Sequence, residues 1–154
     1  LPGNFKEENN FAGDTAFVDF NHVLGTLNEG FNFYRALSHP FAKAAYMMFM
    51  ISEIHQFLDG NGRIARVMMN AELVKEGHSK IMIPTVFRED YLGGRRLLTR
   101  RSMPDTYIRM LQRAQLFSNS ISGINVEEIK IVLEQSSAFK EGDQYILKIP
   151  GLSN

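Results

Sequence analysis

Residues 55–66 hold the side chains whose types and spacing best suit phosphate chemistry. They are His-Gln-Phe-Leu-Asp-Gly-Asn-Gly-Arg-Ile-Ala-Arg. Gly60 and Gly62 allow positive φ and let the backbone approach a ligand without a Cβ in the way. Arg63 and Arg66 are three residues apart, so in a helix they share one face and can contact the same anion. The unpaired N–H groups and the dipole of a helix beginning here would also favour a phosphate.

Two further side chains extend this anion site into a reactive one. A carboxylate such as Asp59 repels a neighbouring phosphate unless a divalent cation lies between them, and Mg²⁺ is commonly held by one or two carboxylates plus substrate phosphates. His55 lies four residues earlier and can accept a proton near the same point. The stretch therefore predicts a Mg²⁺ ligand and a general base beside a phosphate.

Other loops with similar residues fit less well. An EF-hand loop that started at Asp59 would need Asp or Asn at the fifth position and Gly at the sixth, where Arg63 and Ile64 stand. A P-loop needs Gly-Lys followed by Ser or Thr, and the sequence has no such triplet. A plain helix–loop–helix turn with a glycine-rich cap remains the structural alternative.

The pattern His-x-Phe-x-Asp-Gly-Asn-Gly-Arg-x-x-Arg resembles the signature of Fic domains, with Gln56 in place of the usual proline. The resemblance implies an all-α, Fic-type helical bundle with a small β-hairpin flap near the N-terminus and a short C-terminal extension. It also implies an enzyme that transfers AMP from ATP to a Ser, Thr or Tyr hydroxyl of a target protein, with ATP as substrate and Mg²⁺ as cofactor.

The family's roles fall on residues of the motif. His55 would be the catalytic base and Asp59 the metal ligand. The phosphates would be held by Gly60, Asn61, Gly62, Arg63 and Arg66.

The likeness covers roughly residues 1–117. Upstream it includes Pro2, Gly3, Phe5, Lys6, Asn10, Phe11, Ala12, Gly13, Phe17 and Val18; downstream it includes Asn70, Gly77, Arg88, Tyr91, Ile108 and Arg109. We expect a Fic domain over 1–119, followed at 120–154 by a helix and a strand of the same domain or a short extension.

Residues 11–18 place two short apolar pieces around a turn, which is a hairpin pattern. The family resemblance assigns them to a flap whose strand edge docks an extended segment of the target. The flap residues would be Phe11, Ala12, Gly13 and Asp14. An irregular arm that packs its phenylalanines on the core is the alternative.

Two candidates lie outside the motif. Tyr91 is either near the nucleotide, as the resemblance implies, or an ordinary half-buried tyrosine. Residues 137–142 match the family's inhibitory pattern, in which Glu141 would pair with Arg66. Only three positions of that pattern are fixed, so chance explains the match better, and Glu141 stays an alternative.

Regulation and partners follow from the same resemblance. The flap is similar to that of Fic proteins whose inhibitory helix precedes it, and we expect such a helix, or an antitoxin-like partner, to be supplied elsewhere. Transfer of another nucleotide or of a whole phosphate is an alternative, although phosphate transfer goes with a lysine where Gly62 stands. Removal of AMP from modified proteins and nucleotide binding without turnover are further alternatives, and the intact His55 argues against the second.

Composition is that of an ordinary globular domain. The chain has 154 residues, 44% hydrophobic and 22% charged, enough for one domain with its own core. A net charge of zero gives no electrostatic reason to expect nucleic acid or membrane as a partner. Zero cysteines exclude thiolate metal sites and disulfides and fit a reducing compartment, so we expect a cytoplasmic protein.

Apolar periodicity predicts the remaining elements. A first helix is expected at 21–29, with Gly30 as its stop, and a second from a cap at Ser38 to about residue 57. Two more are expected at 63–76 and 86–99, a fifth at 104–117 after a cap at Ser102, and a sixth at 126–136 after Asn125. A strand is expected at 144–149. In the helix at 63–76, the spacing predicts an inward face of Val67, Met68, Ala71 and Val74.

Overall fold

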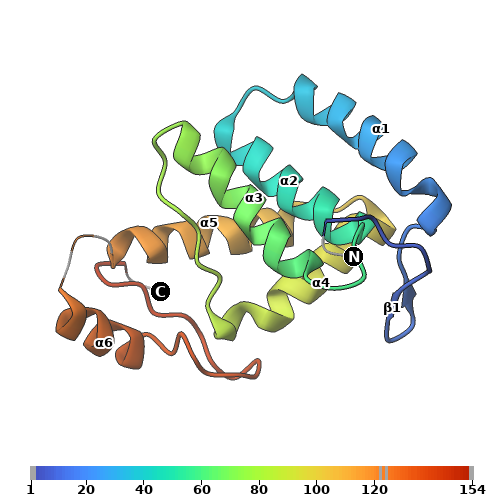
Figure 1. Cartoon of the computed structure of the whole chain (residues 1–154). Coiled ribbons are helices and arrows are strands. Elements are labelled where there is room, and N and C mark those ends of the chain that lie inside the picture. Colours follow the sequence, from blue (N-terminus) through green and yellow to red (C-terminus); the bar gives the residue numbers. More distant parts are fainter. Residues whose placement is uncertain (1–2, 122, 124, 153–154) are drawn as a thin grey trace. The chain divides into compact units, whose positions relative to one another are not determined.

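A computed structural model describes residues 3–121, 123 and 125–152. Pro2, which the family resemblance includes, lies outside the described residues. The described elements are helices and one small hairpin, which confirms the expected fold class (Figure 1). The chain divides into two compact units, Leu1–His78 and Ser79–Asn154, and each is described by itself. Within the described residues, no helix is both long enough and apolar enough to cross a membrane.

The first unit contains the expected hairpin and then three α-helices. In chain order these are β1 (Phe11–Ala12), β2 (Thr15–Ala16), a 3-10 turn η1 (Phe20–His22), α1 (Val23–Ala36), α2 (Pro40–Ile54) and α3 (Asn61–Lys75). The two strands pair antiparallel, and Gly13 takes φ +56° in the two-residue turn between them.

Helices α2 and α3 lie side by side and form the core of this unit (Figure 1). The most buried side chains of α2 include Ala44, Met48 and Ile51, which recur at helical spacing. Met48 from α2 and Met69 from α3 are both fully buried. Burying a side chain of this size contributes roughly 1.5–3 kcal/mol relative to leaving it exposed, so this packing fixes the loop that joins the two helices.

The predicted inward face of α3 is wrong. Val67 and Val74 are 61% and 49% exposed, whereas the buried positions are Asn61, Ala65, Met69, Glu72 and Leu73. Two of these five are polar, and hydropathy alone does not mark polar residues as buried. Their side chains are hydrogen-bonded, which is the condition under which polar groups are buried at low cost.

Three expected helix boundaries are corrected. α1 continues through Gly30 to Ala36, α2 has His39 rather than Ser38 at its N-cap, and Ser102 ends α4 while Pro104 precedes α5. Glycine within a helix is tolerated where a neighbour needs the space that a Cβ would take. At Gly30, an added Cβ would meet the sulfur of Met50 on α2.

We therefore expect Gly30→Ala to lower the free energy of unfolding by about 1 kcal/mol, although alanine is the better helix former. The reason is overpacking against Met50, whose flexible side chain can yield only in part. Urea unfolding of the variant measures the change. Gly25→Ala on the same helix is the control, because a Cβ there meets nothing within 4 Å and should stabilise the helix. Equal effects of the two variants would contradict the expectation.

The second unit contains a 3-10 turn η2 (Thr85–Phe87), α4 (Arg88–Arg101), α5 (Asp105–Ser120) and α6 (Val126–Gln135). α4 and α5 approach closely at Gly94, where a Cβ would lie 3.0 Å from the backbone nitrogen of Tyr107. On α5, Tyr107, Leu111, Ala114 and Phe117 are buried, and Ile108 is half-buried.

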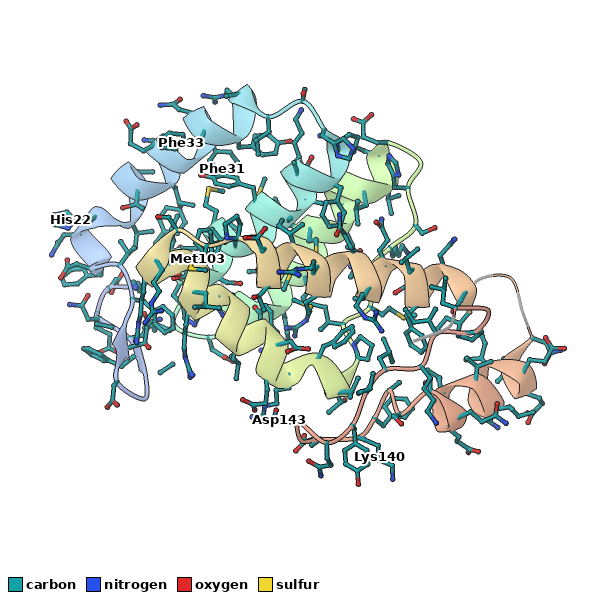
Figure 2. All side chains as sticks on the ribbon, turned by 180° about the vertical axis from the view of Figure 1, so that it is seen from behind. His22, Phe31, Phe33, Met103, Lys140 and Asp143 are labelled. Atoms are coloured by element: carbon teal, nitrogen blue, oxygen red, sulfur yellow. The ribbon has the colours of Figure 1, made fainter. Side chains whose placement is uncertain are left out.

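The C-terminal segment contains the expected helix but not the expected strand. Asn125 Oδ1 accepts a hydrogen bond of 2.9 Å from the N–H of Glu128, which confirms the predicted cap of α6. Residues 144–149 form no strand, and Leu147 and Ile149 are buried as irregular backbone. One backbone bond, from Lys148 N–H to the carbonyl of Ser136, attaches the segment to the end of α6. Lys140 and Asp143, both exposed, project from it (Figure 2).

Candidate active site

The candidate site lies where α2 ends and α3 begins, in the first unit. His55 is the C-cap of α2 and takes the left-handed conformation, φ 51° and ψ 55°. This conformation is uncommon outside glycine, although histidine adopts it more readily than most residues. Non-glycine residues with positive φ concentrate at functional sites, where surrounding contacts maintain them. Here the left-handed residue turns the chain out of the helix and into the loop.

One ring nitrogen of His55 is fixed by the backbone. Nδ1 lies 2.7 Å from the carbonyl oxygen of Ser52. A carbonyl only accepts, so Nδ1 carries the hydrogen of this bond, and in the neutral imidazole the lone pair is then on Nε2. The tautomer needed for a base that acts through Nε2 is therefore set by a helix carbonyl.

The loop is closed by the side chain of Asn61. Its Oδ1 accepts from the N–H of Phe57 at 2.9 Å, and its Nδ2 donates to the carbonyl of Phe57 at 2.7 Å. Asn61 is 2% exposed. These bonds show that its side chain holds the loop shape, while its contact with a phosphate stays a prediction.

The start of α3 presents its backbone to the loop. Gly60, with φ +81°, is the N-cap and has no side chain to cap the first turn. The N–H groups of Asn61 and Gly62 lie at the first two helical positions, where helix geometry supplies no acceptor. These groups and the positive end of the helix dipole are the features that favour an anion.

The two arginines lie over this helix start. A Cβ atom added at Gly60 would lie 3.5 Å from Nη2 of Arg63. A Cβ atom added at Gly62 would lie 3.5 Å from Nη1 of Arg66. The absence of side chains at both glycines thus leaves space that the guanidinium groups approach. Two cations beside uncapped N–H groups make this the strongest candidate for anion binding in the first unit.

Asp59 faces the same loop. Its carboxylate accepts a hydrogen bond of 3.1 Å from Nη2 of Arg63, and the two side chains are 92% and 75% exposed. An exposed pair of this kind contributes little, roughly 0–1 kcal/mol, so Asp59 can exchange Arg63 for another cation at small cost. One accessible carboxylate beside an anion site is a donor set that fits Mg²⁺ held jointly by protein and phosphates. Within the described residues, no cluster of three or more His, Cys, Asp or Glu side chains could hold a metal by itself.

The structure brings all the motif residues proposed for the site around one hollow of about 250 Å³. Its walls are His55, Leu58, Asp59, Gly60, Asn61, Gly62, Arg63 and Arg66. This volume lies just below the range of roughly 300–1,000 Å³ for pockets that hold drug-sized ligands. It suits the phosphate part of a nucleotide better than a whole nucleotide.

The proposed base has an aromatic contact that no local sequence pattern indicates. Phe17, which follows β2, stacks on the imidazole of His55 with ring centroids 3.5 Å apart and planes 7° from parallel. The two residues are 38 positions apart, so no local spacing rule could pair them. The only indication was that Phe17 belongs to the flap region of the resemblance.

The arm before the flap is also bonded to the loop. Asn10 Nδ2 donates to the carbonyl of Phe57 at 3.0 Å, and Lys6 Nζ donates to Asn10 Oδ1 at 2.8 Å. The N–H of Lys6 donates to the carbonyl of Gln56 at 2.8 Å. Lys6 is buried, and this burial lowers the pKa of its ammonium group, although the negative charge of Asp19 acts in the opposite direction. The arm and the loop are therefore joined by a polar network, in addition to the stack of Phe17 on His55.

Of the flap residues, Phe11, Ala12, Gly13 and Asp14 form β1 and the turn, and all four are exposed. Exposure leaves them accessible to a partner, but a docked target stays a prediction.

Tyr91 and Glu141 belong to the second unit. Tyr91 is half-buried on α4, and its hydroxyl accepts a bond of 3.4 Å from Arg95, whose guanidinium also lies over the ring. Glu141 pairs with Arg88 at 3.5 Å, and residues 137–142 are not helical. A nucleotide contact for Tyr91 and an inhibitory role for Glu141 stay predictions.

Comparison with known proteins assigns this arrangement to a family. A model of the Fic/DOC family matches residues 1–73, which include the hairpin, the loop and most of α3. A Fido domain-containing protein of Dictyostelium discoideum is 32% identical over 103 residues, and the match covers 64% of this chain and 72% of that protein. The chain belongs to the Fic/DOC family.

Other Fic relatives match over shorter regions. The protein adenylyltransferase Fic of Drosophila persimilis is 42% identical over 53 residues, or 34% of this chain. The chain spans about a tenth of the length of that relative.

Two solved structures share the fold. Fic-1 from C. elegans has a TM-score of 0.63 at 18% identity, covering 88% of this chain and 38% of that one. A Fic domain containing signaling protein from Bacteroides thetaiotaomicron has a TM-score of 0.58 at 22% identity. The match covers 91% of this chain and 58% of that chain.

Membership in the Fic family, with relatives named protein adenylyltransferase, confirms the family predicted from residues 55–66. The proposed division at residue 119 stays a prediction.

Proposed function

We propose that this Fic domain transfers AMP from ATP to a hydroxyl group of a target protein. The proposal is supported chiefly by one observation: a base, an accessible carboxylate, two guanidinium groups and an uncapped helix start surround a single hollow. Relatives named protein adenylyltransferase support the same reaction. We further propose ATP as the substrate and a Ser, Thr or Tyr side chain as the acceptor.

In this proposal, Nε2 of His55 accepts the proton of the target hydroxyl while its oxygen attacks the α-phosphorus of ATP. The O–H bond breaks as the N–H bond forms. The new P–O bond forms as the bond from the α-phosphorus to pyrophosphate breaks, and pyrophosphate leaves with that electron pair. The hydrogen bond from Nδ1 to Ser52 keeps the imidazole in the tautomer that this transfer requires.

The phosphates are positioned by the remaining residues of the hollow. Arg63 and Arg66 would hold the β- and γ-phosphates, and the N–H groups at the start of α3 would bind the oxygens of the α-phosphate. Mg²⁺, when bound by Asp59 and the phosphates, would offset negative charge on the departing pyrophosphate. Because the protein forms no covalent intermediate in this scheme, positioning and electrostatics account for the rate.

Labelled ATP tests the proposal. With Mg²⁺ and the purified chain, α-³²P label should become bound to protein and γ-³²P label should not. Bound γ label would instead favour transfer of the terminal phosphate, and binding of ATP without either label on protein would favour a nucleotide-binding module. Removal of Mg²⁺ with EDTA should abolish labelling, and its return should restore it.

A further inference from the structure

We propose that Phe17 is a positioning residue that holds the imidazole of His55 in the orientation the base requires. The inference rests on the proposed function, because it assigns a helper to the proposed base. Its first observation is the near-parallel stack, with centroids 3.5 Å apart and planes 7° apart. Rings at this distance are in van der Waals contact.

The stack and the Ser52 hydrogen bond restrict different motions of the same ring. The bond from Nδ1 to the carbonyl of Ser52 directs one edge of the imidazole toward the end of α2. The ring of Phe17 covers one face and prevents the imidazole from tilting toward that side. A nitrogen lone pair lies in the ring plane, so a stack on the face leaves the direction of proton transfer unobstructed by Phe17. An aromatic face also attracts a cation, so Phe17 favours the imidazolium that forms when His55 accepts a proton.

Phe17 is itself fixed relative to the loop. Its N–H donates to the carbonyl of Asn10 at 3.3 Å, at the base of the hairpin. The side chain of Asn10 donates to the carbonyl of Phe57, two residues after His55. The hairpin proposed to dock the target thus carries at its base both the residue that stacks on His55 and a bond to the catalytic loop. A target segment that orders the hairpin would therefore also order the base.

The test compares a non-aromatic and an aromatic replacement in the full chain. Phe17→Leu should lower kcat for incorporation of α-³²P label from ATP about fivefold, which is within the range expected for the loss of one aromatic pair. KM for ATP should not change, because the proposed phosphate contacts lie elsewhere in the hollow. Phe17→Tyr should restore kcat, since it keeps the stacked ring. Phe33→Leu is the matched control, because Phe33 is a 66% exposed phenylalanine on α1, away from the flap (Figure 2).

A second measurement does not depend on activity. The ¹⁵N chemical shifts of the His55 ring report which nitrogen carries the hydrogen, and we expect the Nδ1–H tautomer in the wild type and in Phe17→Tyr. In Phe17→Leu the two shifts should move toward each other, because an imidazole that can tilt toward the vacated side loses its Nδ1 bond to Ser52 part of the time and the tautomers mix. If leucine disturbs the hairpin, Phe17→Met tests the same expectation with another non-aromatic side chain. Wild-type shifts and wild-type kcat in both non-aromatic variants would overturn the inference. Equal labelling by His55→Ala and the wild type would instead overturn the proposed function, and the shifts would still decide whether Phe17 orients the ring.

Discussion

Replacement of His55 should reduce AMP transfer more than any other single change in this chain. We expect His55→Ala and His55→Asn each to lower the rate by about 10²–10⁴-fold, the usual contribution of a positioned general base. Nε2 is the proposed proton acceptor, and neither replacement supplies a group that can take the proton. The measurement is the initial rate of α-³²P incorporation at saturating ATP and Mg²⁺.

The two replacements separate chemistry from backbone conformation. His55 has φ 51°, and asparagine tolerates this region far better than alanine does. If the loss reflected a disturbed loop, His55→Asn would retain most of the activity, and that result would remove His55 from its proposed role. His78→Ala is the matched control, because His78 is an exposed histidine outside the motif. The His78→Ala variant should incorporate α-³²P label at the wild-type rate.

The candidate site could be predicted because it is local in sequence. Residues 55–66 form the end of one helix, a loop and the start of the next, and all the wall residues of the hollow come from this stretch. Spacing along a helix decides which side chains share a face, so the arginine pair follows directly from the sequence. Cap and glycine chemistry likewise indicated where the loop lies.

Contacts between distant segments could not be predicted in the same way. The stack of Phe17 on His55 joins the hairpin to the end of α2, and no periodic pattern encodes such a pair. Gly30 indicates a helix stop by its type, but in the structure it makes room for Met50 from the neighbouring helix. Residues 144–149 have strand-forming composition, yet a strand needs a partner to bond with. Their backbone instead makes separate bonds to other parts of the second unit: the N–H of Lys148 donates to the carbonyl of Ser136, and the carbonyl of Leu147 accepts from Arg113.

Buried polar residues explain the remaining error, on α3. A hydropathy pattern assigns Glu72 to the surface, but the residue is only 9% exposed, and its carboxylate accepts bonds from Tyr34 at 2.8 Å and Lys75 at 2.7 Å. Lys43 and Lys75 also lie near the face of the Tyr34 ring, at 5.4 and 5.9 Å from its centroid. Tyr34 belongs to α1, Lys43 to α2 and Glu72 to α3, so this cluster joins all three helices that support the loop.

Loss of the Glu72 carboxylate should therefore cause a large decrease in stability. We expect Glu72→Ala to lower the free energy of unfolding by about 2 kcal/mol, since the hydroxyl of Tyr34 loses its acceptor and a charge-assisted bond disappears. This value is toward the low end for a buried charge, because the side chain of Lys75 is 46% exposed and solvent screens the pair. Urea unfolding at pH 7 measures it. Glu29→Ala, which removes an exposed carboxylate from α1, is the control and should change stability by less than about 0.5 kcal/mol.

The pH dependence of the stability difference between wild type and Glu72→Ala identifies the cause of that difference. Burial alone would raise the pKa of Glu72, but the hydrogen bonds from Lys75 and Tyr34 and the charges of Lys75 and Lys43 outweigh it, so the pKa is lowered from its usual 4.5. A carboxyl whose pKa is lower in the folded state stabilises the fold fully above the unfolded value and loses that contribution as pH falls through the folded value. The gap between wild type and Glu72→Ala should therefore be constant from pH 7 to about pH 5 and shrink below about 4.5. A gap that persisted unchanged at pH 3 would show that Glu72 acts through packing of its methylene groups, and the ionic account of the three-helix cluster would be wrong.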